Sequence, residues 1–201
     1  PLTSMTILVD NLSEDVDMNP DTRRHFMAEI SRQLTGMSWL ITTMLKISRL
    51  DAGVVELERT KLNVRALVEE ALGRLEIAAE WRNVSFAVDI PEDAEMTGDR
   101  KWTGEAIEHS PAGGEVEISG EENDVYTQIE IRDHGTGVGE EERRRLFERF
   151  YRGASPKEDS IGIGLSLAKE IVEKQGGYIA VEAAPGEGCI FRLKFLRTYI
   201  C

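Results

Sequence analysis

The sequence between Gln128 and Val172 reads QIEIRDHGTGVGEEERRRLFERFYRGASPKEDSIGIGLSLAKEIV. It begins with alternating apolar residues, which are typical of a half-buried strand, and the alternation ends at Asp133. Two glycine-rich stretches follow, at residues 135–139 and 162–164, on either side of a charged helical segment. Glycines let backbone N–H groups approach phosphates, and a single carboxylate can accept a hydrogen bond from a base amino group. The pattern therefore predicts a nucleotide-binding site.

Three motifs in this stretch, taken together, resemble the ATP-binding domain of the sensor histidine kinases. Residues 133–137 (Asp-His-Gly-Thr-Gly) are similar to the first glycine box, and residues 146–152 (Leu-Phe-Glu-Arg-Phe-Tyr-Arg) to the phenylalanine box. Residues 162–165 (Gly-Ile-Gly-Leu) are similar to the second glycine box. One glycine motif alone is weak evidence, because such a motif is often only a turn, but the ordered set is specific.

The resemblance implies a role in ATP binding for nine residues. Asp133 would accept a hydrogen bond from the adenine amino group and would reject guanine, whose carbonyl oxygen would face another acceptor. Residues 140–161 would form a lid, anchored by two phenylalanines that ordinary core packing also explains, and Arg149 or Arg152 would reach a phosphate. The second glycine pair would open a helix whose N-terminus favours phosphate. The predicted nucleotide-binding residues are Asp133, Gly135, Gly137, Phe147, Arg149, Phe150, Gly162, Gly164 and Leu165.

Composition excludes several other classes of protein. The 201 residues are 41% hydrophobic and 30% charged, which is enough for a packed core in one or two domains. The net charge of −13 argues against a nucleic-acid partner, which would require a basic surface. Cys189 and Cys201 suit a reducing compartment and sit in neither a CxxC nor a metal-spaced pattern, and no apolar run approaches the ~20 residues that span a bilayer.

Residues 1–53 have the pattern of two amphipathic helices. Asn19 and Pro20 are a good cap and first residue for the second helix, and Gly53 is a plausible end. The second helix carries an apolar seam at heptad spacing, formed by Met27, Ile30, Leu34, Met37, Ile41 and Met44. Because two such helices cannot close a core, we expect a homodimer with a four-helix bundle. The alternative is that the hairpin packs on the rest of the same chain.

The family resemblance extends to this hairpin. Residues 1–3 (Pro-Leu-Thr) and 48–53 (Ser-Arg-Leu-Asp-Ala-Gly) look like the two ends of the histidine kinase dimerisation hairpin. The resemblance implies a dimerisation and phosphotransfer domain at residues 1–53 and a catalytic ATP-binding domain at residues 54–201. In the family the phospho-accepting histidine lies five residues before the proline, so here it would precede residue 1. We therefore expect a fragment of the cytoplasmic portion of a membrane-anchored protein, with the membrane reached only through segments outside this chain.

The remaining pattern predicts an α+β fold, in which the hairpin is followed by an α/β sandwich of the histidine kinase and gyrase type. Hairpin strands interleaved with a few helices favour one mixed sheet with helices on one face. Strands are predicted at residues 54–58, 86–90, 116–118, 125–131, 178–181 and 189–195, with helices at 64–75, capped by Asn63, and at 164–175, and turns at 113–114 and 185–188.

The segment between Asp99 and Pro111 departs from the family pattern. There the family has a long helix with two asparagines, the later of which binds the magnesium ion on ATP. No asparagine occurs here, and the helix is left with about two turns. Either the magnesium site is lost, or residues are missing between Ala106 and Ile107; we favour the second explanation. A helix that is continuous through these two residues would favour the first. The metal ligands are therefore unknown.

The activity that the resemblance implies is transfer of the ATP γ-phosphoryl group, with magnesium, to a histidine and then to an aspartate of a response-regulator receiver domain. Domain rearrangement would occur near Gly53. A gyrase-like or anti-sigma ATPase shares the ATP-binding fold, but the hairpin argues against it. The alternative from another class is a non-catalytic dimeric scaffold or a phosphatase-biased pseudokinase with a degenerate ATP site.

Overall fold

The structure is a computed structural model of the chain, and it divides into two compact units, Pro1–Ser48 and Arg49–Cys201. The residues that it describes are 2–14, 18–81, 83–109, 115–153 and 162–197. Within these ranges, no helix combines the length and the apolar character that a membrane span requires.

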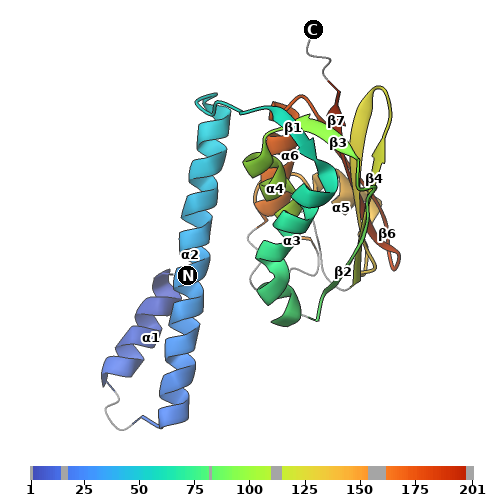
Figure 1. The fold of residues 1–201 in the computed structure, drawn as a ribbon. Helices are drawn as coiled ribbons and strands as arrows, with labels where there is room; N and C mark the ends of the chain where they lie inside the picture. The colour runs from blue at the N-terminus through green and yellow to red at the C-terminus, as the bar shows by residue number, and fades with distance from the viewer. Residues whose placement is uncertain (1, 15–17, 82, 110–114, 154–161, 198–201) are drawn as a thin grey trace. The chain divides into compact units, whose positions relative to one another are not determined.

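Two helices form the first unit, as predicted. Helix α1 covers Leu2–Glu14, and α2 begins at Pro20 and runs to Asp51 in the second unit (Figure 1). The predicted cap is confirmed, because the side-chain Oδ1 of Asn19 accepts a hydrogen bond from the Asp21 N–H at 2.8 Å. The end of α2 is also confirmed: Gly53 has φ +65°, a left-handed conformation that suits glycine, and its N–H donates to the Leu50 carbonyl.

Most of the predicted seam on α2 is exposed. The exposed fractions are 61% for Met27, 55% for Leu34 and 58% for Ile41. Exposure of large apolar side chains to water is unfavourable, and this free-energy cost is removed only when another surface covers them. The homodimer remains a prediction, and this exposed seam is the surface that it would bury.

The second unit is an α/β sandwich, which confirms the predicted fold class. Its elements are β1 (Thr60–Asn63), α3 (Val64–Trp81), β2 (Ser85–Asp89), β3 (Glu95–Gly98), α4 (Arg100–Glu108), β4 (Glu115–Glu122), β5 (Tyr126–Asp133), α5 (Glu140–Arg145), α6 (Gly164–Lys174), β6 (Tyr178–Ala184) and β7 (Gly188–Leu196). The main sheet has the order β2-β4-β5-β7-β6; β2 and β4 are parallel, and the other neighbours are antiparallel. Helices α3, α4 and α6 lie on one face of this sheet (Figure 1).

Alternation along the strands separates an apolar face from a charged face. Ile118, Ile129 and Leu193 are buried on the helix side of the sheet. On the opposite face Glu130 accepts from Arg192 at 2.7 Å and lies 3.6 Å from Arg132. The pattern of period two that predicted the strands therefore also determines which face the helices cover.

The predicted strand at residues 54–58 is wrong. The N–H of Glu58 donates to the side-chain Oδ2 of Asp99 at 2.9 Å instead of to a neighbouring strand. Strand pairing begins two residues later, where Thr60 of β1 lies opposite Gly98 of β3. The sequence did not predict β3, because it has four residues and little alternation. The predicted turn at 113–114 lies outside the described residues.

Helix α4 is continuous through Ala106 and Ile107, both of which are fully buried. Asp99 caps it by accepting a hydrogen bond from the Trp102 N–H at 3.0 Å. This chain therefore folds with a short, continuous helix, which favours the explanation that the asparagine-based magnesium site is lost. The second explanation, that residues are missing here, remains a prediction.

A buried glutamine joins the start of α4 to the end of α6. The side-chain Oε1 of Gln175 accepts from the N–H of Asp99 at 2.7 Å and from the hydroxyl of Thr103 at 3.1 Å. Gln175 follows the last residue of α6, and its side chain is buried. One side chain therefore sets the spacing of two helices at the ends remote from the glycine loops.

Replacing this glutamine is expected to loosen that junction. Gln175→Ala would leave the buried Asp99 N–H without its acceptor, and we expect a loss of about 1–3 kcal/mol in the free energy of unfolding. Denaturant unfolding of residues 1–201 measures the effect. The neighbouring exposed Lys174→Ala is the control and should change stability by less than about 0.5 kcal/mol. Equal effects of the two substitutions would contradict this role of Gln175.

Candidate functional site

Asp133 is a buried carboxylate at the end of β5. Only 2% of the residue is exposed. Its Oδ1 accepts a hydrogen bond from the Gly135 N–H at 2.9 Å, whereas its Oδ2 is buried and has no partner among the described residues. A buried acceptor without a partner is costly, and native proteins keep few of them. Oδ2 is therefore suited to accept a hydrogen bond from a ligand.

Gly137, in the loop after Asp133, is required by packing against a distant turn. Gly137 has φ +62°, and a Cβ on it would lie 1.9 Å from the carbonyl oxygen of Ala184. The N–H of Gly186 donates to the Thr136 carbonyl at 2.6 Å. The loop is thus packed on the turn between β6 and β7, next to the end of β5.

A cysteine lies beside Asp133, which sequence reasoning did not predict. In the antiparallel pair of β5 and β7, Asp133 and Cys189 are directly opposite, and only 6% of Cys189 is exposed. Burial, together with the neighbouring Asp133 carboxylate, raises the pKa of the Cys189 thiol to about 11. The alternation of the last strand could have placed Cys189 on the inner face, but its partner depends on the register of two distant segments.

The second glycine pair stands at the start of α6. Gly164 is the first residue of the helix and Leu165 the second, and no side chain of the described residues caps this end. Uncapped N–H groups at a helix start favour an anion. Gly162 has φ +76°, and a Cβ on it would lie 2.3 Å from the Tyr151 carbonyl oxygen. The start of α6 therefore packs closely on the backbone that follows α5.

The two predicted lid anchors differ in their surroundings. Phe147 is half-buried, and the Lys169 ammonium lies 5.8 Å from its ring centroid. Phe150 is 54% exposed, so ordinary core packing does not explain it. Its φ of +66° is unusual for a bulky residue, and its N–H donates to the Gly162 carbonyl at 2.8 Å. Residues 154–161 of the predicted lid lie outside the described part of the chain.

Arg149 is held by carboxylates of its own unit. One terminal nitrogen lies 3.0 and 2.9 Å from the two carboxylate oxygens of Asp51, and it also contacts Glu170 of α6. Burial raises the pKa of Glu170, and the Arg149 guanidinium opposes that shift. In this structure the predicted phosphate-binding arginine is therefore engaged by two acidic side chains, a contact that its place in the sequence did not indicate.

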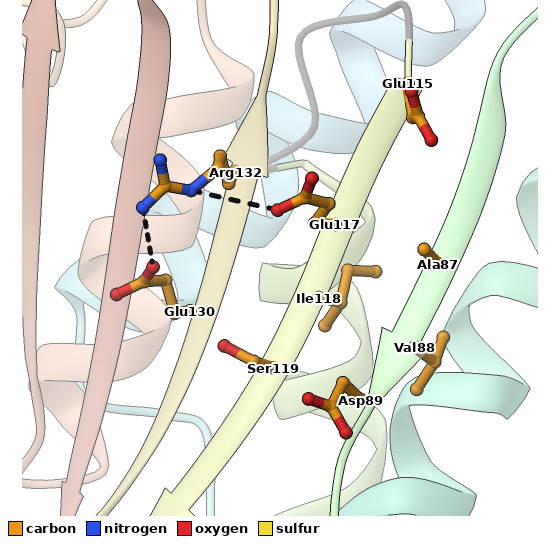
Figure 2. A pocket seen from close by; sticks show the side chains of 9 residues that line it. All are labelled: Ala87, Val88, Asp89, Glu115, Glu117, Ile118, Ser119, Glu130 and Arg132. Carbon is orange, nitrogen blue, oxygen red and sulfur yellow. Dashed lines mark ion pairs between the residues drawn. The ribbon is translucent and has the colours of Figure 1, made fainter.

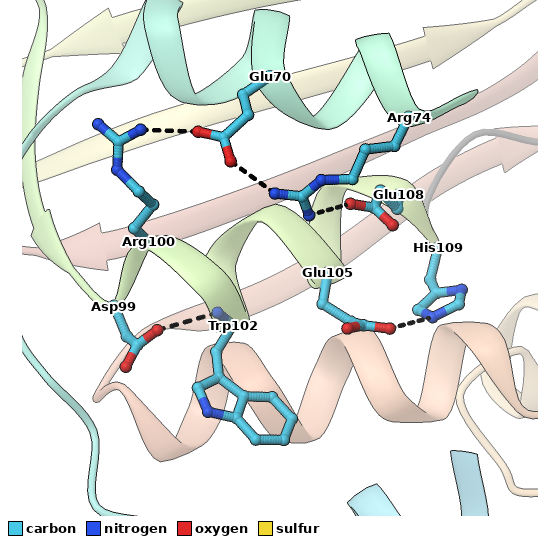
Figure 3. A network of polar contacts seen from close by, with 8 residues as sticks. All are labelled: Glu70, Arg74, Asp99, Arg100, Trp102, Glu105, Glu108 and His109. Carbon is cyan, nitrogen blue, oxygen red and sulfur yellow. Dashed lines mark hydrogen bonds and ion pairs between the residues drawn. The ribbon is translucent and has the colours of Figure 1, made fainter. Parts of the chain in front are cut away.

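A carboxylate and a histidine pair at the end of α4, near the start of α6. The Oε1 of Glu105 lies 3.3 Å from the Nε2 of His109, and both side chains are mostly buried (Figure 3). A Cβ on Gly164 would lie 3.4 Å from the His109 Nδ1. The described residues contain no group of three or more His, Cys, Asp or Glu side chains arranged to hold a metal. Glu105 is thus linked through His109 to the first residue of α6.

An ion-pair network fixes α4 to α3. Arg74 of α3 lies 2.6 Å from both Glu70 and Glu108, and Arg100 lies 2.7 Å from Glu70 (Figure 3). Hydrogen bonds from Arg74 and Arg100 lower the pKa of Glu70. Each exposed pair contributes little alone, but the network restrains the helix that carries Glu105.

The charged face of the sheet has a separate depression of about 360 Å³ (Figure 2). Its lining residues are Ala87, Val88, Asp89, Glu115, Glu117, Ile118, Ser119, Glu130 and Arg132, and none of them is a predicted site residue. Its four carboxylates would repel the phosphates of a nucleotide. It is therefore not the predicted nucleotide site.

Comparison with known families identifies the domain that carries this site. Residues 102–199 match the family HATPase_c, described as histidine kinase-, DNA gyrase B- and HSP90-like ATPase. The match contains Asp133 and both glycine motifs, and it begins within α4.

Similar proteins cover the chain from end to end. The sensor-like histidine kinase SenX3 of Mycobacterium tuberculosis (strain ATCC 25618 / H37Rv) is 27% identical over 96% of this chain, which spans 50% of SenX3. The chain thus has about half the length of that relative. The structure of the Acinetobacter baumannii histidine kinase AdeS has a TM-score of 0.81 at 19% identity, covering 99% of this chain and 96% of AdeS. The histidine kinase ThkA, in complex with the response regulator protein TrrA, has a TM-score of 0.77 at 20% identity, covering 98% of this chain and 58% of ThkA.

The contact between the glycine loop and the β6–β7 turn can be tested with alanine. Gly137→Ala places a Cβ against the Ala184 carbonyl in a left-handed conformation, and we expect a loss of about 3 kcal/mol or more in the free energy of unfolding. Gly73→Ala is the matched control, since it adds a methyl group to open space within α3 and should stabilise by about 0.5–1 kcal/mol. Denaturant midpoints that shift in the same direction for both variants would contradict the packing argument.

Proposed function

We propose that this chain is the kinase core of a two-component sensor, because residues 102–199 match the histidine kinase-, DNA gyrase B- and HSP90-like ATPase family and nearly the whole chain is similar to the sensor-like histidine kinase SenX3. In this proposal the γ-phosphoryl group of ATP is transferred to a histidine nitrogen and then to an aspartate of a response regulator. Such chemistry depends mainly on positioning and on charge neutralisation. The residues described above would supply the positioning.

The buried Oδ2 of Asp133, which has no hydrogen-bond partner among the described residues, carries this proposal. The 6-amino group of adenine is a donor that would satisfy this buried acceptor, whereas the guanine carbonyl would face it acceptor to acceptor. Gly135 holds the other carboxylate oxygen, so the free oxygen has a defined direction. Asp133 would therefore select ATP over GTP by hydrogen bonding at the base.

The start of α6 would bind the phosphates. The N–H groups of the first turn, at Gly164 and Leu165, lack a side-chain cap among the described residues and carry the positive end of the helix dipole. Gly162 would give the backbone the close approach that this arrangement needs. Phe147 and Phe150 would anchor the lid, and Arg149 would reach a phosphate only after leaving Asp51 and Glu170.

Glu105 is the residue that would hold magnesium. Mg²⁺ usually takes one or two protein carboxylates and fills its other positions with water and substrate phosphates. Glu105 supplies such a carboxylate. Its partner His109 lies against the first residue of α6, where the phosphates would bind. When bound, the ion would neutralise phosphate charge. The proposed site thus uses a carboxylate in the segment where the family pattern has an asparagine.

The hairpin would provide the dimer and the partner surface. We propose residues 1–53 as the dimerisation and phosphotransfer domain and residues 54–201 as the catalytic domain. The exposed apolar seam of α2 supports a four-helix bundle formed by two chains. The complex of ThkA with TrrA supports a response-regulator partner. A cytoplasmic location follows from the need for ATP. Light scattering, which reports dimer or monomer, tests the first part of this arrangement.

Replacing Asp133 tests the proposed function. Asp133→Asn removes the charge from the base-binding acceptor, and we expect Mg-ATP affinity to fall about 10- to 100-fold, with less preference over GTP. Isothermal titration calorimetry measures both nucleotides. Asp89→Asn, the same change on the charged face of the sheet, is the control and should bind ATP like the unmodified chain. The proposal fails if the unmodified chain binds no Mg-ATP, or if Asp133→Asn binds it equally well.

Replacing Glu105 tests the metal ligand. Glu105→Ala should raise the Mg²⁺ concentration needed for half-maximal ATP binding by about tenfold, because one charged ligand is lost. Glu76→Ala, which removes an exposed carboxylate of α3, is the control. Titration of Mg²⁺ at fixed ATP measures the change. An unchanged magnesium requirement in Glu105→Ala would exclude Glu105 as the ligand.

A further inference from the structure

A thiol lies beside the carboxylate that would recognise the base. Asp133 and Cys189 are opposite each other in the β5–β7 pair, and both are buried on the inner face of the sheet. Directly opposite residues in an antiparallel pair have Cβ atoms about 4.5–5.5 Å apart. Sulfur and carboxylate therefore share one small space at the end of two strands.

The backbone closes part of that space. A Cβ on Gly188 would lie 1.9 Å from the Asp133 carbonyl oxygen and 3.0 Å from the His134 Cα, so β7 already packs tightly on the loop. On the other side of the carboxylate, Oδ1 receives the Gly135 N–H. The buried Oδ2, which has no partner among the described residues, therefore marks the side from which a ligand approaches Asp133 and its neighbour Cys189.

From this juxtaposition we propose that Cys189 is a covalent modification site at the base end of the nucleotide pocket. It would take small, soft, thiol-specific electrophiles of the activated-disulfide or thiosulfonate class. An adduct on its sulfur would exclude the nucleotide. The inference rests on the proposed function, because a route by which adenine reaches Asp133 also admits a small reagent to Cys189.

The chemistry is a thiolate displacement. With methyl methanethiosulfonate, the Cys189 thiol gives its proton to solvent, the thiolate forms a bond to the reagent's sulfenyl sulfur, and the sulfur–sulfonyl bond breaks. The products are a methyl disulfide on Cys189 and methanesulfinate. Because the raised pKa keeps most of the sulfur protonated at neutral pH, the reaction is slower than that of a free thiol. Dithiothreitol reverses it by thiol–disulfide exchange.

Steric exclusion explains the effect on nucleotide binding. Cys189 is buried directly opposite Asp133, so an added methylthio group would lie close to the Asp133 carboxylate. Interiors are packed closely enough that one extra group displaces a neighbour. The neighbour displaced here would be the adenine ring.

The experiment uses the 201-residue chain with Cys201→Ser, so that Cys189 is the one thiol present. Treatment with methyl methanethiosulfonate should add one methylthio group at Cys189 by mass spectrometry and lower Mg-ATP affinity about tenfold or more. Dithiothreitol should restore both mass and affinity. Mg-ATP at ten times its Kd should slow the modification about tenfold, since only the unbound fraction reacts.

Cys189→Ala and Cys189→Ser, in the same background, are the control variants, and their ATP affinity should not respond to the reagent. The inference is overturned if the methyl disulfide forms on Cys189 while ATP affinity is unchanged. It is also overturned if Cys189 of the folded chain stays unmodified under conditions that modify the urea-unfolded chain. If the untreated Cys201→Ser chain binds no ATP, the proposed function itself fails, and the mass measurement still reports separately on the thiol.

Discussion

The close contact between the glycine loop and the β6–β7 turn is the constraint on which the proposed site depends. At Gly137 and at Gly188 a carbonyl oxygen of another segment lies so close that a Cβ atom would clash with it. This contact holds the loop across the end of β5 and turns the Gly135 N–H toward Asp133. One carboxylate oxygen is thereby occupied and the other left for a ligand. The glycine motif in this protein is therefore a site of close backbone packing between the loop after β5 and the β6–β7 turn.

The second part of the proposed site is formed by α4 and α6, which contact each other at both pairs of ends. Gln175 joins the start of α4 to the end of α6 through a buried side-chain oxygen. At the opposite ends, His109 of the α4 C-terminus lies against Gly164 at the α6 N-terminus. The ion pairs of Arg74 add a restraint toward α3. Although α4 has only nine residues, these contacts hold His109, the partner of Glu105, beside the helix end that would bind phosphate.

The carboxylates near the sheet are placed on its outer face. There Glu117, Glu130 and Glu182 pair with arginines across strands. On the helix side the sheet is apolar, and the one carboxylate buried there on β5 is Asp133. A net charge that would disfavour a polyanion at long range is therefore compatible with a phosphate site formed by backbone N–H groups.

The sequence by itself determined the features that depend on local order: the two helices of the hairpin, the strands with period two, the helix caps at Asn19 and Asn63, and the glycine motifs around Asp133. These follow from residues close to one another in the chain. Tertiary structure decided the features that depend on distant partners. The N–H of Glu58 bonds to Asp99 and not to a strand, Arg149 pairs with Asp51, and Cys189 lies beside Asp133. No periodicity within one segment encodes these contacts, because each is set by the register and packing of segments that meet only in the folded chain.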